Sequence, residues 1–88
     1  MHINSSLDWP EVEAQLRASI QHIRNPQNAF HARKMLRNFE GMITKLSQVE
    51  VTSRRAPGQN GAKAFDELAK FNEELDNFDK WILMLMLT

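Results

Sequence analysis

Apolar side chains recur at helical spacing through the last third of the chain. They stand at Leu68, Phe71, Leu75, Phe78, Ile82 and Leu85. The steps between them are 3, 4, 3, 4 and 3 residues, which keeps them on one side of an α-helix over about five turns. This spacing is typical of helices that pair lengthwise with another helix. It predicts a helix over about residues 61–87.

Two earlier segments carry stripes of the same kind. The first comprises Trp9, Val12, Leu16, Ile20 and Ile23. The second is wider and comprises Ala32, Met35, Leu36, Phe39, Met42, Ile43, Leu46 and Val49. These stripes predict helices over about residues 8–24 and 26–53, and no segment has the alternating pattern of a strand.

Local signals mark the ends of these helices. Asp8 can cap the first helix, with Glu11 three residues later reaching back to complete a capping box. Asn25 precedes Pro26, so the first helix should end there, and the same pair can cap and open the second helix. Residues 54–61 read RRAPGQNG and break every apolar period, which predicts a flexible loop.

The elements combine into an all-α fold of one domain, residues 1–88. We expect a long antiparallel helical hairpin, about 26–53 and 61–87, with the shorter helix of about 8–24 packed on it as a three-helix bundle. The hairpin helices would be about 40 Å long and the first helix about 25 Å. The first helix would then cover the second only as far as about residue 42.

The uncovered half of the hairpin predicts an interface. Large exposed apolar patches usually mark contact surfaces, and two hairpins can form a four-helix layer. We therefore expect a homodimer with a larger helical bundle. A monomer that closes the gap by bending and a complex with a different protein are the alternatives.

The C-terminal residues 81–87 are apolar on all sides of their helix. Either the first helix and the start of the second wrap them, or they form a methionine-rich docking surface. Together with the uncovered half of the hairpin they give the candidate protein-interface residues. These are Leu46, Val49, Phe65, Leu68, Trp81, Met84 and Leu87.

Charge is balanced overall, with 11 basic and 11 acidic residues among 88, but it is uneven along the chain. Residues 17–55 hold eight Arg or Lys against two Glu, whereas residues 56–88 hold three Lys against six carboxylates. Complementary charge between the paired helices explains this asymmetry. The alternative is a basic surface that contacts anions or nucleic acid. Its candidate residues are Arg33, Lys34, Arg37, Lys45, Arg54, Arg55 and Lys63.

Phe30 lies among the basic side chains of the second helix in helical projection, although we expect it to pack near Ile20 and Ile23. The net charge of zero lacks the positive balance common in nucleic-acid binders. Binding of nucleic acid is therefore the second hypothesis, after protein binding.

Candidate chemistry is sparse. The chain has no cysteine, and its three histidines show no i, i+4 pairing for a metal. Gly58 and Gly61 have the G-x-x-G spacing of a phosphate clamp, but no strand or Gly-Lys-Ser/Thr accompanies them. We expect no enzyme activity, no catalytic or metal site and no cofactor.

The longest apolar run is seven residues, against about 20 for a membrane span, and the polar start of the chain is unlike a secretory signal. We therefore expect a soluble, cytoplasmic protein without membrane contact. The sequence favours a small non-enzymatic protein–protein interaction or regulatory adaptor module that acts through helix–helix packing. A nucleic-acid-binding accessory protein that uses the basic second helix and the Arg54–Lys63 loop is the alternative.

Overall fold

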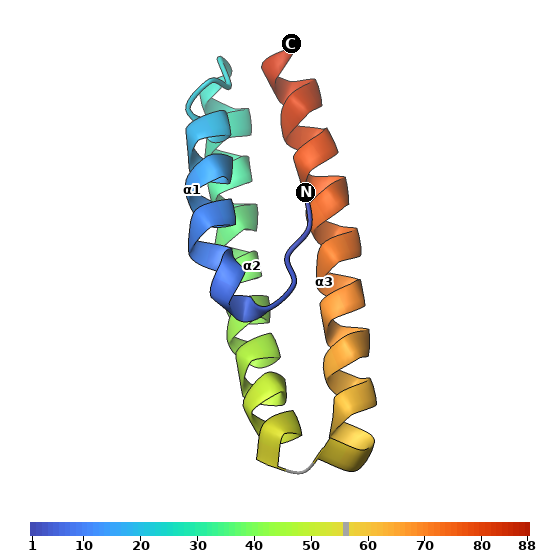
Figure 1. Cartoon of the computed structure of the whole chain (residues 1–88). Helices are drawn as coiled ribbons and strands as arrows, with labels where there is room; N and C mark the ends of the chain where they lie inside the picture. Colours follow the sequence, from blue (N-terminus) through green and yellow to red (C-terminus); the bar gives the residue numbers. More distant parts are fainter. Residues whose placement is uncertain (56) are drawn as a thin grey trace.

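The computed structural model describes residues 1–55 and 57–88, with side chains described outside 56–60. It contains the short 3-10 turn η1 (Ser6–Asp8) and three helices, α1 (Trp9–Ile20), α2 (Pro26–Arg55) and α3 (Pro57–Met86). The helices α2 and α3 form a long antiparallel hairpin, and α1 packs against one half of it (Figure 1). This confirms the predicted all-α hairpin with a shorter N-terminal helix.

The first helix begins with a different cap from the predicted one. Ser5 and Asp8 form the capping box, one turn earlier than predicted, and it opens η1. Ser5 Oγ accepts from the Leu7 amide at 3.2 Å, and Asp8 Oδ2 accepts from the Ser5 amide at 3.4 Å. Asp8 makes no capping hydrogen bond to α1, so the predicted pairing with Glu11 is wrong. The preceding turn already engages the Asp8 carboxylate.

The turn between α1 and α2 follows the Asn25–Pro26 signal. Helix α1 ends at Ile20, earlier than the predicted 24, and the Ile23 amide donates to the Ile20 carbonyl at 3.1 Å. This tight turn leaves Ile23 buried. Asn25 Oδ1 accepts from the amides of Gln27 at 2.9 Å and Asn28 at 3.3 Å. The predicted cap of the second helix is therefore confirmed.

The predicted loop at 54–61 is wrong in its extent. Helix α2 continues through Arg55 and α3 begins at Pro57, while residue 56 lies outside the described residues. Proline suits the first position of a helix, because its fixed φ is helical and that position needs no amide donor. A residue pattern that reads as a loop therefore forms the first turn of α3.

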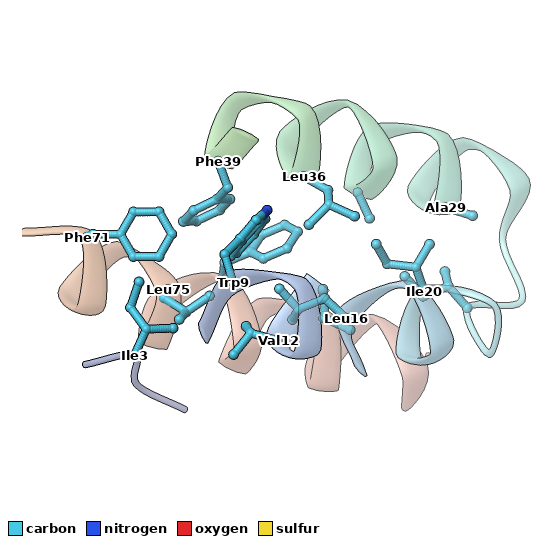
Figure 2. Packing of buried hydrophobic residues seen from close by; sticks show 14 of the residues in the cluster. Ile3, Trp9, Val12, Leu16, Ile20, Ala29, Leu36, Phe39, Phe71 and Leu75 are labelled. Carbon is cyan, nitrogen blue, oxygen red and sulfur yellow. The ribbon is translucent and has the colours of Figure 1, made fainter. Parts of the chain in front are cut away.

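The core is one cluster that joins all three helices. Trp9 of α1 stacks on Phe39 of α2 at 6.2 Å between ring centroids and meets the edge of Phe71 of α3 at 5.6 Å. Phe39 also contacts Phe78 at 5.0 Å. Figure 2 shows this aromatic group beside the aliphatic side chains of α1 and α2. The buried set also contains Ile3, Val12, Leu16, Ile20, Ile23, Ala29, Ala32, Leu36, Leu46, Leu75 and Ile82.

The N-terminal segment, defined as Met1–Asn4, extends the cover of the hairpin beyond α1. It passes along α3 (Figure 1), and Ile3 is 2% exposed. The following turn reaches α2, where the Ser6 amide donates to Glu50 Oε2 at 3.2 Å. Leu46 is 1% exposed, so the prediction that it lacks cover is wrong. Residues 1–8 add a layer that helical periodicity does not reveal.

We predict that Leu75→Ala lowers the free energy of unfolding by about 2–5 kcal/mol, because it empties a fully buried site. Leu75 is 0% exposed, whereas Leu83 on the same helix is 54% exposed. The matched control Leu83→Ala should change that free energy by less than about 0.5 kcal/mol. Urea denaturation followed by circular dichroism measures both, and equal effects would contradict the assignment of the core.

Candidate functional site

The α2–α3 groove is an open hollow of about 400 Å³ along the hairpin. Phe39 and Phe78 are buried beneath it, and Met35, Met42 and Trp81 contribute partly exposed apolar walls. Its polar lining is Asn38, Glu74 and Asn77. No α1 residue lines the groove. An apolar centre with polar edges is the usual composition of a protein interface.

Trp81 is held at one end of the α2–α3 groove by its neighbours. Its ring meets the edge of His31 of α2 at 5.6 Å between centroids, and it lies 5.9 Å from Phe78. The two contacts fix a large aromatic side chain that remains half-exposed. A fixed aromatic anchor loses little conformational entropy on binding, which suits it to a contact surface.

Both signs of charge border the far end of the groove. Lys45 Nζ lies 3.6 Å from Glu67 Oε1, and this pair connects α2 with α3. A smaller hollow of about 190 Å³ continues the groove between this pair, Lys70 and Glu74. Among the described residues, Lys45 and Glu67 form the only ion pair within 4 Å between α2 and α3. Direct pairing therefore accounts for little of the charge asymmetry between α2 and α3.

The predicted interface residues do not form one surface. Leu46 is in the core and Trp81 lines the α2–α3 groove, whereas Phe65 and Leu68 line a separate hollow. Val49 is half-buried at the distal end of the hairpin, beside Lys63. The exposed fractions of Phe65, Met84 and Leu87 are 71%, 65% and 81%.

The C-terminal turns of α3 are covered on one side only. Ile82 is 1% exposed, and Leu85 and Met86 pack partly against the core. Leu83, Met84 and Leu87 remain exposed. The rest of the bundle therefore wraps residues 81–87 in part and leaves apolar side chains at this end.

Apart from Lys45, which pairs with Glu67, the predicted anion-contact side chains lie in two places. Arg33, Lys34 and Arg37 are exposed, and none has an ion pair within 4 Å in the described part of the chain. Phe30 is 67% exposed beside them, so its predicted packing near Ile20 and Ile23 is wrong. We call these four residues the basic face.

Arg54, Arg55 and Lys63 are also exposed, but they lie at the loop end of the hairpin. Helical rise puts Arg54 about 25 Å along α2 from Arg37. The two basic groups therefore cannot contact one short ligand together.

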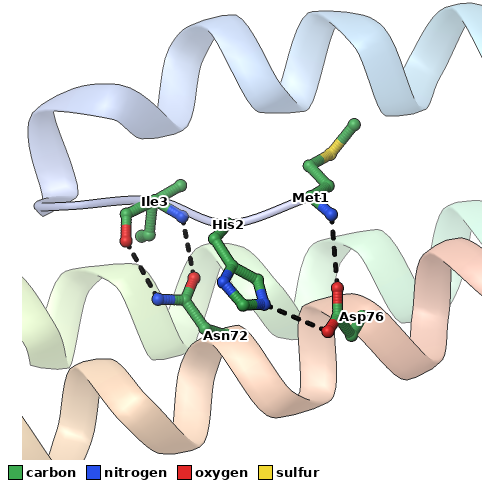
Figure 3. Close-up of polar contacts among 5 residues, drawn as sticks. All are labelled: Met1, His2, Ile3, Asn72 and Asp76. Carbon is green, nitrogen blue, oxygen red and sulfur yellow. Dashed lines mark hydrogen bonds and ion pairs between the residues drawn. The ribbon is translucent and has the colours of Figure 1, made fainter.

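Sequence reasoning missed a polar site between the N-terminal segment and α3 (Figure 3). The Ile3 amide donates to Asn72 Oδ1 at 2.8 Å, and Asn72 Nδ2 donates to the Ile3 carbonyl at 2.9 Å. One turn further along α3, Asp76 accepts from His2 Nε2 at 3.0 Å and from the Met1 amine at 3.2 Å. The only sequence signal for this site is that two polar residues, Asn72 and Asp76, each follow a residue of the apolar stripe of α3.

Comparison with protein-family models, curated proteins and solved structures finds no match for the chain. No described helix combines the length and hydropathy that crossing a membrane requires. Across residues 1–55 and 57–88, no three His, Cys, Asp or Glu side chains are grouped as metal ligands would be.

We predict an acid-sensitive attachment of the N-terminal segment. The hydrogen bond from His2, followed by that from the Met1 amine, lowers the pKa of Asp76 below its ordinary value of 3.8. A lowered pKa in the folded state means that this contact stabilises the protein above the unfolded-state pKa. The contribution should therefore be lost as pH falls from about 3.8 through the folded-state pKa of Asp76.

Carboxyl carbon NMR shifts of Asp76 and exchange of the Ile3 amide should follow this change together. In His2→Ala the Asp76 titration should move up toward 3.8, because the largest cause of the lowered pKa is gone. An unchanged titration in that variant would contradict the role of His2.

Proposed function

We propose that the protein is a non-enzymatic interaction module that acts through helix–helix packing, and that its first partner is a second copy of the same chain. The observation that carries the proposal is the α2–α3 groove, where Met35, Met42 and Trp81 remain partly exposed above buried Phe39 and Phe78. A groove between two long antiparallel helices is matched in shape by another helix, because side-chain ridges of one helix fit such grooves.

A two-fold axis parallel to the helices would place α2 of each copy against α3 of the other. Met35 of one copy would then lie near Trp81 of the other and cover its open side. Lys45 and Glu67 lie at the same level of the hairpin, 3.6 Å apart, so each could also face its opposite charge across the interface. This complementarity supports a second copy as the occupant, in a four-helix layer with coiled-coil-like packing.

The polar groups of the groove suit a specific register. Asn38 and Asn77 lie on opposite walls between the apolar positions. Asparagines inside helical interfaces favour the register in which their side chains hydrogen-bond to one another, because other registers leave those amides unpaired. A dimer of this kind would leave the basic face on α2 of each copy exposed. It would therefore present two equivalent outer surfaces, which suits an adaptor.

We predict that the chain has a solution mass of twice 10.2 kDa and that Met35→Glu returns it to the monomer mass. A carboxylate at Met35 would lie unpaired in the apolar centre of the interface, which carries a large desolvation cost. Light scattering after size exclusion, at several protein concentrations, gives the masses.

Phe30→Glu is the matched control for that experiment. It places the same charge on the same helix at a more exposed apolar position outside the groove, so it should leave the dimer intact. A wild-type protein that stays monomeric at high concentration would remove the second copy as partner. Dissociation by both variants would place the interface elsewhere.

Nucleic-acid binding stays the second candidate function, and the basic face supports it. Arg33, Lys34 and Arg37 are exposed cations, and the exposed ring of Phe30 could stack on an unpaired base. Arg residues beside an aromatic ring are common in single-strand binding surfaces. The neutral net charge and the separate position of Arg54 and Arg55 favour the protein-interaction function over this one.

If the basic face binds single-stranded nucleic acid, Arg33→Ala with Arg37→Ala should weaken binding. The slope of log affinity against log salt should become shallower by about 1.4, because two phosphate contacts are lost. Lys80→Ala, an exposed cation on α3, is the control and should leave the slope unchanged. Fluorescence anisotropy with a labelled oligonucleotide at low ionic strength measures this, and the absence of salt-sensitive binding would exclude the function.

A further inference from the structure

The N-terminal segment lies on α3 as a bound peptide would (Figure 3). Asn72 pairs with both backbone groups of Ile3, at 2.8 Å through its oxygen and 2.9 Å through its nitrogen. A neighbouring β-strand satisfies an extended backbone in the same reciprocal manner. This contact requires an extended chain but no particular side chain.

Side-chain selectivity comes from two adjacent contacts. Ile3 is 2% exposed and belongs to the same buried cluster as Val12 of α1 and Leu75 of α3 (Figure 2). Asp76 accepts hydrogen bonds from the Met1 amine and from His2 Nε2. The site therefore fits a branched aliphatic residue that follows one or two hydrogen-bond donors such as an amine or an imidazole. We call it the Asn72 cleft.

Few contacts retain the segment in the Asn72 cleft. Ile3 is the only fully buried side chain of the segment, and the Met1 side chain is 20% exposed. The ion pairs of Asp76 are open to solvent, where such pairs contribute little. The amides of Asn4 and Ser5 donate to Asp8 Oδ2, so these hydrogen bonds stabilise the turn η1 and do not attach the segment to α3. Two covered side chains and two amide hydrogen bonds are a small set of contacts to set against the entropy of ordering four residues. The segment should therefore detach without unfolding the helices.

The Asn72 cleft adjoins space for a longer ligand. A hollow of about 450 Å³ runs beside the segment, lined by the exposed ring of Phe65 together with Leu68 and Ala69. None of the residues that line it lines the α2–α3 groove. The two surfaces can accordingly be tested independently of each other.

We propose that the Asn72 cleft is a recognition site for an extended peptide segment of another chain, with an amine or imidazole hydrogen-bond donor one or two residues before a branched aliphatic side chain. The N-terminal segment occupies this site in cis and competes with the incoming segment. This inference goes beyond the helix-packing function, because it concerns a different surface and an extended partner.

The test uses the peptide Met-His-Ile-Asn-Ser-Ser, labelled at its C-terminus, and the full-length protein. Ile3→Asp should release the segment and raise peptide affinity about tenfold or more over wild type. In wild type only the molecules whose own segment has detached can bind the peptide, so the apparent affinity is scaled down by that open fraction. Adding Asn72→Ala to that variant should lower affinity again by about tenfold. A peptide with Asp in place of Ile should not bind.

Circular dichroism first verifies that Ile3→Asp keeps its helices, and Ile3→Ala serves as the milder variant if it does not. In wild type, excess peptide should release the N-terminal segment and shift the NMR signal of the Ile3 amide, because the peptide takes its place on Asn72. Undetectable peptide binding to both Ile3 variants, or equal binding with and without Asn72, would overturn the proposal. Met35→Glu should leave peptide affinity unchanged whatever it does to the solution mass, which separates this test from that of the helix groove.

Discussion

The contact of Trp9 with Phe39 and Phe71 is the interaction on which the rest of the structure depends. It lies where α1 meets both helices of the hairpin, at 6.2 Å and 5.6 Å between ring centroids. Helix α1 is only 12 residues long and would be marginal by itself in water, so its stability has to come from packing. By fixing the first residue of α1, Trp9 also fixes the direction from which the preceding residues arrive at α3.

Two surfaces follow from this one cluster. Phe39 and Phe78 form its open side and are the floor of the α2–α3 groove, so packing of the core sets the shape of that groove. At the other edge Ile3 joins the cluster, and its backbone meets Asn72. A substitution in the aromatic group would therefore disturb both surfaces, whereas Met35 and Asn72 each affect one of them.

The two surfaces differ in the kind of partner that each would suit. The α2–α3 groove offers apolar area with both signs of charge at its edge. It suits a helix, because the backbone hydrogen bonds of a helix are already made within the helix. The Asn72 cleft offers an amide that pairs with an unsatisfied backbone, which suits an extended segment. A small domain with a thin core has little room for an enclosed cavity. Shallow surfaces of these two kinds are what such a bundle can present to partners.

The sequence by itself determined the three helices, the hairpin and the cap at Asn25, because helical periodicity and capping are local properties of the chain. It also predicted a basic surface that includes Arg33, Lys34 and Arg37, and these side chains are exposed in the structure. Only the tertiary structure decided that Ser5 and Asp8 form the first cap, that α3 begins at Pro57, and that Leu46 is covered. The N-terminal segment has no periodicity, and the Ile3–Asn72 pair joins residues 69 positions apart. Such a contact depends on where the helices place α3, and no local pattern encodes that.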